Sequence, residues 1–149
     1  MSNRFPLQTV FDLMRTRADD AAKNLGRLIS TEEDAKSRFS LLENYRNEYA
    51  QRFRTAAESG ISPLQWANYQ DFLGKLDDAI NQQNQIVTES NKRTAEGRQH
   101  WLNEKGRVQA FDTLAKKHEA NVRYQDEKNE QKKSDEFSVR KYNQSASDD

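Results

Sequence analysis

The sequence has 149 residues, of which 34% are hydrophobic and 32% charged, and its mean hydropathy is −1.17. A compact domain of this length usually has close to half of its residues apolar, so this composition excludes a thick enclosed core. It leaves enough apolar material for a narrow seam between helices. Basic and acidic residues number 24 each and are interleaved along the chain, which argues against the basic face that nucleic acids and anionic membranes require.

Neither targeting segments nor cysteines are found in the sequence. The N-terminal residues lack the apolar run of a signal peptide, and no stretch approaches the length of a membrane-spanning helix. The absence of cysteine excludes a disulfide framework and a thiolate metal site. We therefore expect a soluble, cytoplasmic protein.

The first predicted helix covers about residues 7–58. Apolar residues recur along it at alternating spacings of three and four, from Met14 to Ala56, and eleven of the thirteen positions in this series are apolar. This spacing is typical of the seam of a coiled coil. The seam residues predicted in this helix include Leu25, Leu28, Phe39 and Phe53.

A turn is predicted at residues 59–62. Gly60 can adopt the left-handed conformation that ends a helix, and Ser62 is a suitable N-cap for the next one. Pro63 fits the first helical position, where its missing N–H costs nothing, and Gln65 completes a Ser-x-x-Gln capping box. A turn this short forces the two helices to run antiparallel.

The second predicted helix covers about residues 63–142. Every seventh residue from Trp66 to Val122 belongs to one series, in which eight of nine positions are apolar and Thr94 is the exception. Heptads kept over this length predict a left-handed coiled coil. The seam residues predicted in this helix include Trp66, Leu73, Ile80, Val87, Trp101, Val108 and Phe111.

The middle third of the predicted seam differs from the rest. When the two helices are paired about a centre near Ile61, the second helix contributes small or polar residues to this part of the seam. Because these residues bring little apolar area, we predict that the seam is weakest at this point. The residues are Gln83, Ser90, Thr94 and Gly97.

The second helix continues past the start of the first in this pairing. Residues 125–136 contain no apolar residue, so after Val122 the helix is predicted to project without a seam. Residues 144–149 are predicted to be a disordered tail. The predicted fold class is thus all-α, a single domain at 1–143 that forms an extended antiparallel two-helix coiled coil.

No pattern in the sequence suits catalysis. The two histidines, His100 and His118, have no second ligand-type residue at a convincing metal-binding spacing, and no nucleotide-binding or hydrolase motif is present. Two paired helices also offer no walls for a dry pocket. We expect no enzymatic activity, no metal, no cofactor, no small-molecule substrate and no nucleic acid.

Beside the seam, each predicted helix carries a further stripe near the turn, and the pairing sets the two stripes at the same height. Tyr45 and Phe72 lie in these stripes but outside the seam, which favours a docking patch for another protein. The alternative is that both rings only cover their own helices. The stripes are Arg38, Leu42, Tyr45 and Tyr49 on the first helix and Phe72, Leu76, Ala79 and Gln83 on the second.

Three blocks of sequence, in order, resemble the flagellar export protein family FliJ. They are Leu42-Glu-Asn-Tyr45-Arg-Asn-Glu-Tyr49, the Gly60-Ile61 turn, and Trp66-Ala-Asn-Tyr69-Gln-Asp-Phe72. The resemblance extends over the chain to about Tyr142. It implies a component of the flagellar type III protein export apparatus, folded as a helical hairpin similar to the central stalk (γ subunit) of rotary ATPases.

The same resemblance implies partners and a location. Members of the family sit in the ring of the flagellar export ATPase, contact the export-gate membrane protein FlhA, and help to escort export chaperones. The protein is then expected to be cytoplasmic and peripherally associated with the membrane at the flagellar base. No motif marks the ATPase contact, whereas the gate contact carried over to this sequence comprises Leu42, Tyr45, Tyr49, Phe72, Leu76 and Ala79.

Other interpretations remain open from the residues. The chain could be the equivalent stalk protein of a virulence-type III secretion system, a self-associating coiled-coil scaffold, or a small chaperone for one exported subunit. A scaffold should carry further apolar stripes over the projecting helix, and residues 125–136 carry none.

Overall fold

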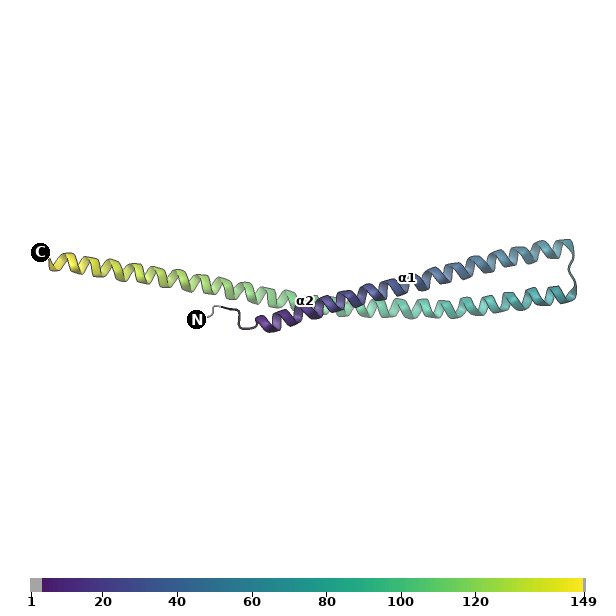
Figure 1. The fold of residues 1–149 in the computed structure, drawn as a ribbon, viewed down its shortest axis with the longest axis horizontal. Coiled ribbons are helices and arrows are strands. Elements are labelled where there is room, and N and C mark those ends of the chain that lie inside the picture. Colours follow the sequence, from purple (N-terminus) through teal and green to yellow (C-terminus); the bar gives the residue numbers. More distant parts are fainter. Residues whose placement is uncertain (1–3, 149) are drawn as a thin grey trace. The chain divides into compact units, whose positions relative to one another are not determined.

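Two helices joined by a short turn make up almost all of the computed structural model, which describes residues 4–148. Helix α1 runs from Gln8 to Ser59 and helix α2 from Pro63 to Ser147, and the described residues contain no strand (Figure 1). The predicted all-α hairpin is confirmed. None of the described helices is both long enough and apolar enough to span a membrane.

The turn has the local structure that its sequence predicts. Gly60 has a φ of 87°, in the left-handed region, and its N–H donates to the Ala57 carbonyl at 3.2 Å. The Ser62 N–H donates to Gln65 Oε1 at 3.0 Å, and the Gln65 N–H donates to Ser62 Oγ at 3.2 Å. These reciprocal bonds form the predicted capping box, which satisfies backbone donors that the first turn of α2 would otherwise leave unpaired.

The C-terminal end of α2 lies beyond the predicted one. The helix continues to Ser147, so the structure places most of the predicted tail, 144–149, inside it. The sequence contains no glycine after Gly106 and no proline after Pro63 to stop the helix. Near the end, the Ser147 hydroxyl donates to the Gln144 carbonyl at 2.9 Å.

By its internal contacts the chain divides into two units. The turn unit is Asp19–Asn103, and the terminal unit combines the residues up to Ala18 with those from Glu104 onwards. Each unit contains a part of α1 and a part of α2.

In the turn unit, the helices pair antiparallel with aromatic rings near the turn. The Phe53 ring lies 4.9 Å from that of Trp66 and 5.2 Å from that of Tyr69, centroid to centroid. Phe53 and Tyr69 are equally far from Ile61 along the chain, as the predicted register requires. Further from the turn the buried apolar residues are smaller, and they are Ala21, Leu25, Ala35 and Leu76.

The middle third of the seam is closely packed. Ser90 and Thr94 are buried, and the Thr94 hydroxyl donates to the Leu28 carbonyl at 3.3 Å. A Cβ atom on Gly97 would lie 2.5 Å from Leu28 Cδ1. The small and polar residues that predicted a weak seam therefore permit a close approach of the helices and hydrogen bonds to α1.

Glu32 interrupts the apolar series of α1 in this region. Its Oε1 atom lies 2.9 Å from Lys36 Nζ. The neighbouring Lys36 ammonium, and after it the nearby Thr94 hydroxyl, hold the pKa of the Glu32 carboxyl below its usual value of 4.5. The charged form of this carboxyl thus has partners from its own helix and from α2.

In the terminal unit, Phe11 is the centre of the packing, with only 2% of its surface exposed. Its ring meets Phe111 edge-on at 6.4 Å, and the Arg15 guanidinium lies 3.9 Å from the centre of the Phe11 ring. Phe11 continues the three–four spacing of the α1 seam by one step before Met14, so the periodicity extends one step beyond the predicted start of the series. From residue 123 to 148 every side chain is exposed.

Glu104 is a buried polar residue at the start of the α2 part of the terminal unit. Its Oε1 atom accepts from Arg107 Nη1 at 3.4 Å, while Oε2 has no hydrogen-bond partner in the described part of the chain. A carboxylate at a seam position costs stability but can fix the register of a coiled coil.

We expect Ser62→Ala to lower the free energy of unfolding by about 1 kcal/mol, because it removes the N-cap of α2. Ser62→Asp keeps an acceptor at this position and should lose much less. Urea denaturation followed by circular dichroism measures both, and equal losses for the two variants would show that the cap is unimportant.

Gly97→Ala and Gly74→Ala form a matched pair of helix-interior changes. A Cβ on Gly74 meets nothing within 4 Å, whereas on Gly97 it requires Leu28 to move. Gly74→Ala should gain about 0.5–1 kcal/mol of stability from the removal of glycine's backbone freedom, and Gly97→Ala should gain less or lose. Thermal denaturation of both variants tests this, and equal gains would contradict the close approach at Gly97.

Candidate protein-docking surface

An aromatic cluster lies beside the seam close to the turn, formed by Tyr45 and Tyr49 of α1 and Phe72 of α2. The Phe72 ring lies 4.4 Å from that of Tyr49 and meets that of Tyr45 edge-on at 6.3 Å. Tyr45 is 45% exposed, while Tyr49 and Phe72 are half-buried. We call these three residues the aromatic patch. Tyr45 and Phe72, which belong to the two stripes predicted to lie at the same height, are in contact.

An ion pair crosses between the helices at the level of the aromatic patch. Arg46 Nε donates to Asp77 Oδ1 at 3.0 Å, and both side chains are substantially exposed. Such a pair contributes little to stability. It nevertheless joins residues that the predicted pairing sets at one level, and so marks the register that brings Tyr45 to Phe72.

The other residues assigned to the gate contact differ in exposure. Leu42 and Ala79 are half-buried, whereas Leu76 is only 7% exposed and is part of the core of the turn unit. Because a partner cannot reach a buried side chain, Leu76 supports the patch from beneath rather than forming its surface.

The predicted seam residues also fall into three groups by exposure. Leu25 is buried, and Trp66 is 49% exposed although its ring lies against Phe53. Two helices can cover only part of so large a side chain. The remaining residues are half-buried, and they are Leu28, Phe39, Phe53, Leu73, Ile80, Val87, Trp101, Val108 and Phe111.

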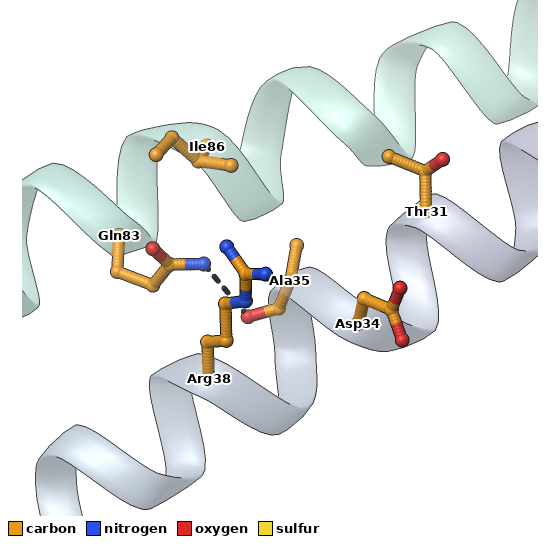
Figure 2. A pocket seen from close by; sticks show the side chains of 6 residues that line it. All are labelled: Thr31, Asp34, Ala35, Arg38, Gln83 and Ile86. Carbon is orange, nitrogen blue, oxygen red and sulfur yellow. Dashed lines mark hydrogen bonds between the residues drawn. The ribbon is translucent and has the colours of Figure 1, made fainter.

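A hollow of about 180 Å³ lies between the helices of the turn unit, further from the turn than the aromatic patch (Figure 2). Gln83 Nε2 donates to the Ala35 carbonyl at its base, at 3.0 Å. Arg38 and Ile86 face each other across it, and Ile86 is 49% exposed. Thr31 and Asp34 complete the lining.

Arg38 and Gln83 are the last residues of the two stripes predicted from the sequence, and the other residues that line the hollow were not predicted. Ile86 follows Gln83 by three residues and Thr31 precedes Arg38 by seven, so both continue the same helical spacing. Extending the α2 stripe by one step and the α1 stripe by two would therefore have reached residues that line the hollow.

The terminal unit exposes several large apolar side chains. Leu7, just before α1, Val10 and Leu13 of α1, and Leu114 of α2 are each substantially exposed, and four further residues are exposed by more than half of their surface. These four are Tyr124, Phe137, Val139 and Tyr142.

Neither histidine takes part in a cluster that suits metal chemistry. The His118 ring lies 5.7 Å from that of Phe5, and His100 is exposed on α2. Among residues 4–148, no group of three or more His, Cys, Asp or Glu side chains could hold a metal ion.

The difference in exposure between Leu76 and Tyr45 predicts different costs of truncation. Leu76→Ala should lower the free energy of unfolding by about 2–5 kcal/mol, since it leaves a cavity in the core. Tyr45→Ala should cost about 1 kcal/mol, mainly through the lost ring contact with Phe72. Urea denaturation measures both values, and a larger loss for Tyr45→Ala would place Tyr45 in the core instead.

Comparison with known proteins identifies the family. The family model described as "Flagellar FliJ protein" matches residues 2–147. The chain is 32% identical over 140 residues to the flagellar FliJ protein of Salmonella typhi, covering 94% of this chain and 95% of that protein. It is 30% identical, with the same coverage, to the flagellar FliJ protein of Escherichia coli strain K12. The chain therefore belongs to the FliJ family of flagellar export proteins.

Proposed function

We propose that this protein is a stalk of the flagellar export apparatus, linking the export ATPase ring to the export-gate membrane protein FlhA. The observation that carries the proposal is the aromatic patch: a half-exposed tyrosine packed edge-on against a phenylalanine, beside the seam of a helix pair. Rigid aromatic side chains at the centre of a surface commonly dominate protein binding. The helix pair thus offers a surface on which a partner can dock.

The gate contact belongs to the aromatic patch and the half-buried residues beside it, Leu42 and Ala79. The capping box at Ser62 and Gln65 fixes where α2 begins, and the Arg46–Asp77 ion pair marks the register at the level of the patch. A partner therefore meets side chains that are already held in place, which lowers the entropy cost of binding.

The ATPase contact belongs to the terminal unit. In this unit α2 continues beyond the level at which α1 begins (Figure 1), and residues 123–148 are exposed throughout. Charged and polar residues predominate there, with a few exposed apolar residues such as Tyr124 and Phe137. A surface of this kind suits a contact that is made and released repeatedly.

Escort of export chaperones and peripheral association with the membrane at the flagellar base complete the proposal. Membership of the FliJ family supports both. The absence of a spanning helix among the described residues is compatible with attachment through a partner protein.

Binding assays on two variants test whether the gate protein and the ATPase bind to separate surfaces of this protein. Tyr45→Ala combined with Phe72→Ala should weaken binding to the cytoplasmic domain of the gate protein by about thirtyfold, corresponding to roughly 2 kcal/mol, and should leave ATPase binding nearly intact. Truncation after Val122 should have the opposite effect on the two partners.

Tyr124→Ala serves as the control for the gate assay, because it removes an exposed tyrosine of the other unit. Circular dichroism should report unchanged helicity for the double variant. If the double variant lost both partners equally while remaining helical, the assignment of separate surfaces would be wrong.

A further inference from the structure

The side of the turn unit that carries the aromatic patch continues as a double row of residues away from the turn. Along each helix the row follows alternating spacings of four and three, which keep positions on one side of a coiled-coil pair. The α2 row is Phe72, Leu76, Ala79, Gln83, Ile86, Ser90, Arg93, Gly97 and His100. The α1 row is Tyr49, Tyr45, Leu42, Arg38, Ala35, Thr31, Leu28 and Asn24.

Contacts between the helices show that the two rows face each other at three levels. Phe72 meets Tyr45 and Tyr49 at the aromatic patch, and Gln83 bonds to the Ala35 carbonyl in the hollow of Figure 2. Further on, Gly97 lies against Leu28. The two rows therefore line one groove from the patch to Gly97.

Two hollows interrupt the floor of this groove. The first is the hollow between Arg38 and Ile86, of about 180 Å³. The second, of about 300 Å³, opens beside Leu28 and Gly97 and is lined also by Asn24, Arg93 and His100. Each hollow is several times the volume that one water molecule occupies, about 30 Å³, so each has room for a side chain of a partner.

We propose that this groove takes one amphipathic α-helix of the partner that docks on the aromatic patch. The inference rests on the proposed function, and it names the kind of segment that the partner supplies and the length of the surface. The docking surface then extends from Tyr45 and Phe72 through Ile86 to Gly97, beyond the residues assigned to it from the family resemblance.

The spacing of apolar side chains in the groove fits a helix. Phe72, Ala79 and Ile86 follow each other at intervals of seven residues, the repeat that a third helix of a coiled coil would share. From Phe72 to Ile86 the groove is about 21 Å long at 1.5 Å per residue. A helix of about four turns covers this length with its i, i+3, i+4 and i+7 positions. An extended peptide finds no strand edge to pair with on two helices.

The charges in the groove indicate the polar side of the partner helix. Arg93 is already paired with Glu89 at 2.7 Å, whereas Arg38 is exposed and forms no ion pair with any residue the structure describes. The Arg38 guanidinium points across the first hollow (Figure 2). We therefore expect the partner helix to place a carboxylate beside Arg38, flanked by apolar residues that reach Ile86 and Ala79.

Charge changes beyond the aromatic patch test the groove. The probe is the cytoplasmic domain of the export-gate protein, titrated against the full chain. Ile86→Glu and Arg38→Glu should each weaken binding by about tenfold or more, as expected for a contact inside a docking surface.

Each variant has a matched control on the same helix. Asn84→Glu introduces the same side chain as Ile86→Glu, but two residues away and so on the opposite side of α2. Arg54→Glu makes the same charge change as Arg38→Glu and lies nine residues from Tyr45, half a turn around α1. Both controls should bind within about twofold of the original chain, and circular dichroism should show equal helicity in all four variants.

A photo-crosslinking residue in place of Ile86 tests the helical form of the partner. The captured positions on the partner should lie three or four residues apart, along one side of a helix. Capture at every second position would indicate an extended segment, and capture of a second copy of this chain would indicate self-association. Either result would overturn the inference.

The outcomes separate the inference from the proposed function. If the original chain does not bind the gate domain, the proposed function is wrong, and the proposal for the groove is wrong as well. If the chain binds and depends on Tyr45 and Phe72, but Ile86→Glu and Arg38→Glu bind normally, the proposed function stands and the longer groove is wrong.

Discussion

The narrow seam between two helices is the constraint on which the rest of the structure depends. Each helix has one neighbour and can bury only one stripe of its surface, so large side chains remain partly exposed even where they pack. Trp66 contacts Phe53 but keeps about half of its surface exposed, whereas Ala21 and Ala35 are buried because they are small. Apolar surface is therefore left over beside the seam, and this surface is available to other proteins.

The turn and contacts between particular side chains give the helix pair its register. Apolar residues at heptad spacing by themselves tolerate a shift of one repeat. The short turn opposes such a shift, because Gly60 and the capping box at Ser62 and Gln65 fix where α2 begins. A shift would also separate Arg46 from Asp77 and move Leu28 away from Gly97, where the missing Cβ leaves room for it. These features together favour the single register in which Tyr45 meets Phe72.

In the candidate surface, some residues are buried and support the packing, while their neighbours are exposed and can contact a partner. Leu76 and Phe72 are four positions apart on α2, yet Leu76 is buried in the core while Phe72 reaches the surface. The same division separates Ala35, beneath the hollow of Figure 2, from Arg38 and Ile86 at its sides. A protein that acts only through its surface depends on such supporting residues, since they hold the exposed side chains in fixed positions.

The sequence by itself determined the helices, the turn and the pairing, because these follow from local chemistry and from the period of the apolar residues. Gly60, Ser62 and Gln65 specify the turn through backbone and cap geometry, and the heptads specify which stripe of each helix faces the other. Only the tertiary structure decided how deeply each residue is buried. The sequence predicts that Thr94 and Gly97 weaken the seam, but in the structure both residues are closely packed. The distance between two helices depends on the side chains of both, so it cannot be judged from one helix alone. For the same reason the hollow between Arg38 and Ile86, two residues far apart in the chain, became visible only when the helices were paired.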